Sequence, residues 1–180
     1  MGCPSTSFMR TEGEVRELSR FLGLVLTILV FAAAVGAVIV AERKASGKRV
    51  ALRSAAELGD LERVRLLVTQ GADMNARTRR VMFGWTPLLA AIYHERTNVA
   101  LYLIQSGANV NMADDMGETP LMRAVEQGET LVVKELLSRG ADLYAKDRSG
   151  IDAFGYANTP PPKPEIVDML ESAKAKQKLK

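Results

Sequence analysis

Few residues in this sequence have the types and spacing that catalysis or metal binding require. His94 is the only histidine and Cys3 the only cysteine among the 180 residues, so they cannot complete a zinc site or form an internal disulfide. The sequence has no glycine-rich phosphate loop and no nucleophile elbow around a serine. Four carboxylates could attract a cation, but roles in turns and in solvation explain them better: Asp114, Asp115, Glu118 and Asp147. We therefore predict no catalytic residue, no metal site and no cofactor.

The dominant pattern is a segment that recurs after 33 residues. GWTPLLAAI begins at Gly84 and GETPLMRAV begins at Gly117, and each is followed at the same offset by a block that ends in aspartate. An earlier copy over residues 50–76 keeps the paired alanines and the Gly-Ala-Asp-x-Asn ending, but it lacks the Thr-Pro start. A degenerate copy follows Gly150. A fixed period of this length is typical of stacked helical units.

Each copy carries signals for the start and the end of its helices. Thr86 and Thr119 can cap a helix start through their hydroxyl groups, and the proline that follows each of them suits the first helical position. Apolar residues at helical spacing predict a second helix in each unit. Three glycines can end these second helices in a left-handed conformation: Gly71, Gly107 and Gly140.

The Thr-Pro-Leu starts and the 33-residue units resemble the ankyrin repeat family over about residues 47–173. The resemblance implies an all-α ankyrin-repeat solenoid, in which helix-turn-helix units are joined by hairpin loops. We place the repeat domain at residues 50–173, with copies that start near residues 50, 86, 119 and 152. A basic C-terminal tail follows at residues 174–180.

Three features depart from the family pattern. Where the family motif carries histidine, this chain has Leu89 and Met122, so we expect the hydrogen bond of that histidine to be absent. Glu95 stands where a turn glycine is usual, which predicts a strained turn. Prolines between residues 159 and 164 interrupt the last unit, which we expect to pack loosely.

A separate signal is the uncharged apolar run over residues 21–41. A helix of this length spans the roughly 30 Å hydrocarbon core, so we predict one transmembrane helix between an N-terminal tail at residues 1–20 and a basic linker at residues 42–49. A cleaved signal peptide is the alternative, although its apolar region is usually shorter. Small residues four apart in the run, such as Ala32 and Gly36, would permit self-association through this helix.

The distribution of basic residues indicates the orientation of this helix. Three arginines precede the run and five basic residues follow it within a similar distance, so the positive-inside rule places the repeat domain in the cytoplasm. Because this margin is small, a periplasmic repeat domain is the alternative. The net charge of +3 comes mainly from the basic flanks and the C-terminal lysines. The repeats mix acidic and basic residues, so we predict no nucleic-acid binding.

The family resemblance implies that a protein partner binds to the hairpin tips and to the exposed side of the first helices. On this sequence the candidate contacts are aromatic residues with their neighbours in one copy and mainly acidic residues in the next: Met82, Phe83, Trp85, Tyr93, His94, Asp115, Met116, Glu118, Glu126 and Gln127. The aromatic residues predict an apolar contact centre and the acidic residues a polar rim. Val50 and Thr86 are 36 positions apart, so the loop around residues 79–85 carries an insertion.

These observations together predict a membrane-anchored adaptor that binds a protein partner at the membrane surface and is not an enzyme. The alternative is a periplasmic accessory or protective factor that assists an envelope enzyme. A further hypothesis is a surface module that binds anionic lipid through its lysines.

Overall fold

The computed structural model describes residues 46–77 and 84–177 of the chain. The chain divides into two compact units, and all described residues belong to the second, Ala45–Lys180. Within the described ranges, no helix has both the length and the apolar character needed to cross a membrane. The predicted membrane span at residues 21–41 and the self-association predicted for it lie outside these ranges.

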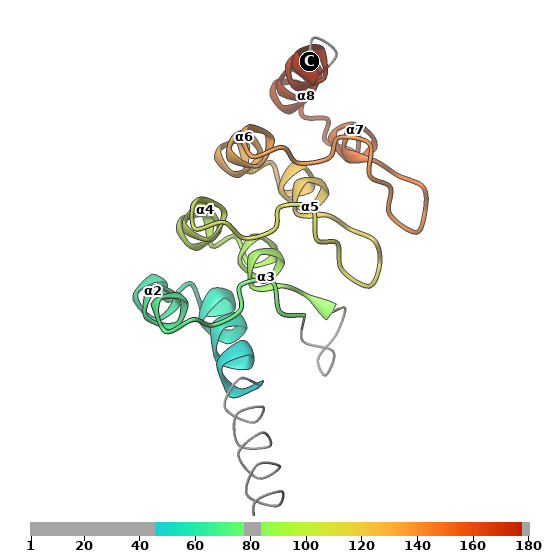
Figure 1. Cartoon of the computed structure of the whole chain (residues 1–180). Coiled ribbons are helices and arrows are strands. Elements are labelled where there is room, and N and C mark those ends of the chain that lie inside the picture. Colours follow the sequence, from blue (N-terminus) through green and yellow to red (C-terminus); the bar gives the residue numbers. More distant parts are fainter. Residues whose placement is uncertain (1–45, 78–83, 178–180) are drawn as a thin grey trace, which may run out of the picture. The chain divides into compact units, whose positions relative to one another are not determined.

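Helices in the described ranges follow one another in pairs. The first pair joins a helix described over residues 46–58, whose first residues belong to the predicted basic linker, to α2 (Leu61–Thr69). The later pairs are α3 (Pro87–Tyr93) with α4 (Thr97–Gln105), α5 (Pro120–Gln127) with α6 (Thr130–Ser138), and α7 (Ala153–Ala157) with α8 (Pro164–Gln177). Figure 1 shows the first helices of the pairs in one row and α2, α4, α6 and α8 in a second row. Every regular element of the described residues is a helix, which confirms the predicted all-α repeat solenoid there.

The helices begin where the sequence predicts their caps. The hydroxyl oxygen of Thr86 accepts a hydrogen bond from the backbone N–H of Leu89 at 3.2 Å, and that of Thr119 accepts one from Met122 at 3.3 Å. The expectation that the histidine hydrogen bond is lost is wrong for the second of these units. There, the Sδ atom of Met122 accepts a hydrogen bond from the backbone N–H of Thr119 at 3.4 Å, so a thioether occupies the place of an imidazole.

The core lies between successive pairs, because each helix packs on its counterpart in the next pair. α3 contacts α5, α5 contacts α7, α4 contacts α6, and α6 contacts α8. Leu88 and Leu121, which are 33 positions apart, are both buried at about 1% exposure or less. Burying such a side chain contributes about 1.5–3 kcal/mol. Ile166 and Leu170 of α8 are also buried, so the expected loose packing of the last unit is wrong.

The turn between the two helices of a pair uses a left-handed residue. Gly59 and Gly128 have φ of +78°, and Glu95 fills the same place in the pair α3–α4 with φ of +56°. A side chain with a Cβ atom rarely adopts this conformation. The predicted strain at Glu95 is therefore confirmed, as are the left-handed glycines at 71, 107 and 140.

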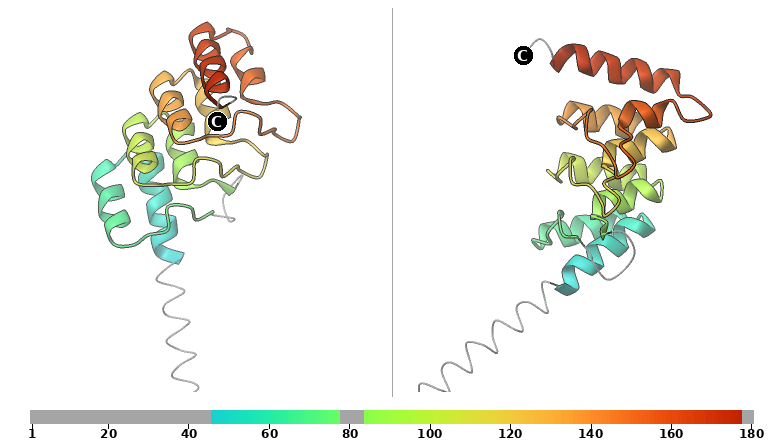
Figure 2. Two further views of the ribbon diagram at one scale, coloured as in Figure 1. Left: turned by 45° about the horizontal axis from the view of Figure 1, so that its top comes forward. Right: turned by 90° about the vertical axis from the view of Figure 1, so that its right-hand side faces the viewer.

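Asparagine side chains connect the loops that follow the second helices. Asn75 Oδ1 accepts a hydrogen bond from the backbone N–H of Asn109 at 2.8 Å, and Asn111 Oδ1 accepts one from Asp142 at 2.8 Å. Figure 2 shows that these loops run side by side along one side of the stack. Tyr144 occupies the next equivalent position and is exposed. These asparagine side chains therefore form hydrogen bonds between successive repeats.

Candidate functional site

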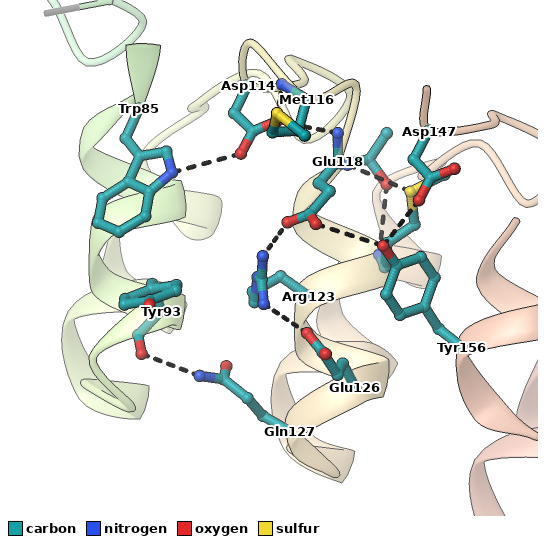
Figure 3. Close-up of polar contacts among 12 residues, drawn as sticks. Trp85, Tyr93, Asp114, Met116, Glu118, Arg123, Glu126, Gln127, Asp147 and Tyr156 are labelled. Atoms are coloured by element: carbon teal, nitrogen blue, oxygen red, sulfur yellow. Dashed lines mark hydrogen bonds and ion pairs between the residues drawn. The ribbon is translucent and has the colours of Figure 1, made fainter. Parts of the chain in front are cut away.

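The first helices and the loops that lead into them carry a concentration of aromatic and charged side chains. We define the first-helix face by the residues that Figure 3 draws on α3, on α5 and at their starts: Trp85, Tyr93, Glu118, Arg123, Glu126 and Gln127, together with His94 at the end of α3. Its properties come from how the side chains contact one another.

Three aromatic rings form a cluster at one end of this face. The ring centroids of Trp85 and Tyr93 lie 4.3 Å apart, and those of Tyr93 and His94 lie 5.3 Å apart. Tyr93 and His94 are exposed, while Trp85 is half-buried and donates a hydrogen bond from Nε1 to Asp114 Oδ2 at 3.3 Å. The structure thus brings together three of the aromatic candidates. Met82 and Phe83 lie outside the described residues.

Arg123 joins the aromatic cluster to the acidic candidates. Its guanidinium carbon lies 5.2 Å from the centroid of the Tyr93 ring, which is within the range of a cation–π interaction. The same guanidinium group pairs with the carboxylates of Glu118 and Glu126. One arginine therefore pairs with both glutamates that were predicted to belong to a polar rim. Figure 3 shows this arrangement on α5.

Arg123 was not among the candidate residues, although the sequence carries a signal for it. Glu126 follows Arg123 by three positions, so on a helix the two side chains lie on the same face and can pair. Glu118 lies before the helix start, and only the fold shows that its side chain turns back to Arg123. Gln127 adds a further link, since its Nε2 donates to the backbone carbonyl oxygen of Tyr93 at 2.9 Å.

Tyr156 of α7 extends the polar network to the next repeat. Its hydroxyl donates to Asp147 Oδ2 at 2.9 Å, and Glu118 Oε1 lies 3.3 Å from the same oxygen. Burial, together with the bond to Asp147, raises the pKa of Tyr156 to about 12. Burial alone would raise the pKa of Asp147, but bonds from the backbone of Ile151 and from the Tyr156 hydroxyl outweigh it and hold the pKa below its usual value. At neutral pH this pair is a fixed hydrogen bond.

Asp114 organises the hairpin loop between α4 and α5. Its Oδ1 atom accepts hydrogen bonds from the backbone N–H groups of Met116 at 2.8 Å and Glu118 at 3.0 Å. Burial raises the pKa of Asp114, and the bonds from Met116 and Trp85 oppose that shift. Within the described ranges, no group of three histidine, cysteine, aspartate or glutamate side chains could hold a metal ion.

Asp115 and Met116, the other two candidates of this copy, lie at the tip of the same loop. Asp115 pairs with Arg77 of the preceding loop at 2.6 Å, so the structure does not bring it to the Arg123 network. Arg77 also donates from Nε to the carbonyl oxygen of Gly84 in its own loop at 3.1 Å, so its pair with Asp115 is the contact that connects the two loops. Met116 is 42% exposed, and its carbonyl oxygen accepts a hydrogen bond from the backbone of Arg148. Met116 is thus an apolar side chain presented at the loop tip.

Glu129 lies at the turn between α5 and α6, and one of its two carboxylate oxygens lacks a hydrogen bond within the described ranges. Glu129, which precedes α6, accepts a hydrogen bond at Oε2 from the hydroxyl of Thr97 at 3.1 Å. Its Oε1 atom is buried and has no hydrogen-bond partner among the described residues. Burial raises the pKa of Glu129, the Thr97 bond lowers it, and the charge of Glu95 raises it further. This carboxylate is therefore destabilised in its charged form.

Comparison with known proteins agrees with the repeat pattern and the fold. Residues 52–147 match the family described as ankyrin repeats in three copies. The chain is 40% identical over 71 residues to Protein PhlB of Serratia liquefaciens, which covers 39% of this chain and 30% of that protein. It is 43% identical over 70 residues to protein phosphatase 1 regulatory subunit 27 of Mus musculus, or 39% of this chain and 44% of that protein.

A third relative shows how local these matches are. The mitochondrial disaggregase of Bos taurus is 39% identical over 70 residues, which is 39% of this chain but 10% of the disaggregase. The chain thus matches less than half the length of each of these relatives. The family match, in contrast, extends over more than half of the chain. Together with the stacked helix pairs, it shows that this chain belongs to the ankyrin repeat family.

Proposed function

We propose that the chain is a non-catalytic adaptor, which binds a protein partner on the first-helix face and is anchored in a membrane by residues 21–41. The observation that carries the binding proposal is the aromatic cluster of the half-buried Trp85 with the exposed Tyr93 and His94. Tryptophan and tyrosine are among the side chains most often found at the energetic centre of protein interfaces. One similar protein is named as a regulatory subunit of a phosphatase, and a regulatory role accords with binding.

The fixed positions of these side chains favour binding. Tyr93 lies between the Trp85 ring and the Arg123 guanidinium group, and Gln127 bonds to its backbone. A side chain that is already ordered loses little rotamer freedom when a partner covers it, which saves about 0.5–1.5 kcal/mol for each such residue. Met116 would extend the apolar contact to the loop tip.

Affinity purification of the full-length chain tests the binding proposal. Tyr93→Ala should reduce the recovery of the partner at least about fivefold, since the loss of an aromatic anchor usually costs more than about 1 kcal/mol. Tyr144→Ala is the matched control, because Tyr144 is 52% exposed and Tyr93 is 43% exposed, on different parts of the fold. Helical circular dichroism should show both variants folded. Equal recovery of the same partners by both variants would refute binding through this face.

The membrane anchor is proposed from the apolar run alone, and the single cysteine of the chain provides its test. Cys3 precedes residues 21–41, whereas a Tyr144→Cys substitution in a Cys3→Ser background places the only thiol in the repeat domain. A membrane-impermeant maleimide should label one of these two proteins in sealed vesicles and the other in inverted vesicles. Labelling of both from the same side would exclude a single span.

The same labelling decides the compartment. We propose that the repeat domain lies in the cytoplasm, because more basic residues follow the apolar run than precede it. Protection of the Tyr144→Cys thiol in intact cells is the expected result. Labelling of that thiol in intact cells would instead favour the periplasmic accessory role.

A further inference from the structure

We infer that the partner segment bound by the first-helix face carries a basic side chain, an arginine or lysine, that docks between the exposed edge of Tyr93 and the carboxylate of Glu126. This inference rests on the proposed binding function and specifies the chemistry of the partner. It follows from three properties of the face: its charge, its unused acceptor and its own internal arginine.

The charge of the face is negative. Among its own residues Glu118 and Glu126 are acidic and Arg123 is basic, and the neighbouring Asp114 and Asp147 add negative charge to the network that Figure 3 draws. Asp115 does not change this balance, because Arg77 neutralises it. A partner with positive charge at this position therefore meets a complementary field, which favours correct docking over docking of acidic segments.

Basic groups lie at the edges of the face. Arg148 flanks the loop tip beside Met116, and Lys163 lies near the end of α5, where its side chain approaches Gly128. Like charge at these two residues disfavours a basic side chain of the partner at the loop tip and near Gly128.

A hydrogen-bond acceptor without a donor occurs on the face. Glu126 uses Oε2 to pair with Arg123, and its Oε1 has no partner among the described residues, while its side chain is 42% exposed. This oxygen can accept a hydrogen bond from a partner, and a guanidinium or ammonium group supplies donors only.

Arg123 shows in this molecule how such a group is held. Its guanidinium lies over the Tyr93 ring while it pairs with two glutamates, and its side chain is 19% exposed. A partner cation would use the same two kinds of contact, an aromatic ring and a carboxylate, from the solvent side. Arg123 then competes with the partner for these carboxylates. Its removal should strengthen the binding of a basic segment, which a purely structural role for Arg123 does not predict.

Selection from a random peptide library on the full-length chain in lipid nanodiscs tests the inference. The selected peptides should be enriched in arginine or lysine next to an aromatic or aliphatic residue. Synthetic copies of these peptides, measured by fluorescence anisotropy, should bind Glu126→Lys about tenfold more weakly and Arg123→Gln several-fold more tightly than the wild type. Glu62→Lys is the matched charge reversal, since Glu62 lies on α2 with an 89% exposed side chain, and it should bind like the wild type.

The outcomes separate this inference from the proposed function. Peptides that lose affinity with Tyr93→Ala but carry no basic enrichment, or that bind Glu126→Lys normally, would overturn the inferred partner chemistry and leave the binding face intact. Weaker binding to Arg123→Gln would also overturn it. Selected peptides that bind Tyr93→Ala as well as the wild type would reject the binding face itself.

Discussion

Replacing Glu95 by glycine should stabilise the repeat domain. Among the described residues, Glu95 is the non-glycine residue with a positive φ, at +56°, and its backbone N–H bonds to the carbonyl oxygen of Ile92 at 2.9 Å. Gly128 makes the same turn with φ of +78° and bonds to Val125 at 3.1 Å. The two turns thus have the same left-handed backbone conformation, which glutamate disfavours at position 95 and which glycine adopts readily at position 128.

The expected gain follows from two opposing contributions. A left-handed conformation costs a residue with a Cβ atom roughly 1–2 kcal/mol. Glycine loses about 0.5–1 kcal/mol of this advantage, because it is more flexible in the unfolded chain. The net gain for Glu95→Gly is about 0.5–1 kcal/mol, which corresponds to a Tm increase of roughly 2–5 °C for a domain of this size. Loss of the Glu95 charge near Glu129 acts in the same direction.

Trp85, the only tryptophan, reports unfolding of this region by fluorescence in urea or on heating. Two variants separate the contributions. Glu95→Gln removes the charge and keeps the strained backbone, so it should give only a small part of the gain. Gly128→Glu installs the strain in the next pair and should cost about 0.5–1 kcal/mol by the same two contributions. The reasoning is refuted if Glu95→Gly unfolds no later than the wild type while Gly128→Glu leaves stability unchanged.

Three further perturbations test the contacts between repeats. Asn111→Ala removes the two hydrogen bonds of this side chain to the next repeat and should lower the free energy of unfolding in urea by about 1–2 kcal/mol. Tyr144→Ala at the equivalent position of the next repeat should be nearly neutral. Equal losses in the two variants would contradict the role of the asparagine bonds. Glu129→Gln should raise the Tm at neutral pH. Because a raised carboxyl pKa means that the folded state binds the proton more readily, this group stabilises the wild type as pH falls toward 4.5, and thermal melts of the variant should lack that gain. The folded wild type keeps the Tyr156 phenol proton up to about pH 12, so its stability should fall between pH 10 and about 12, and Tyr156→Phe should not show this fall. Alkaline unfolding curves that are the same for both proteins would contradict the bond to Asp147.

The sequence predicted most of the fold because its signals are local. The capping hydroxyls of Thr86 and Thr119 and the left-handed residue at position 95 act within a few residues of the chain, so type and spacing suffice to find them. The packing of the last unit was mispredicted for a different reason. Prolines before α8 mark a break in the chain, but the burial of Leu170 depends on α6 and α7, which its own sequence does not reveal.

The sequence named the aromatic residues, the glutamates and Gln127 of the face as candidates, but it did not name the residues that connect them. Trp85, Tyr93 and His94 belong to one copy, so their proximity follows from a single loop and helix. The residues that bond to these rings come from the next repeat: Asp114 lies in the next loop, and Arg123 lies on α5. Contacts between repeats depend on how the units stack, and a pattern within one repeat cannot place them.

Site-specific photo-crosslinking tests the proposed binding face most directly. A benzophenone amino acid incorporated at position 93 in living cells should form a discrete crosslinked product with one protein partner on illumination. The same amino acid at position 144, a comparably exposed tyrosine position away from the face, should give none. A partner captured from position 144 and not from position 93 would contradict binding through the first-helix face.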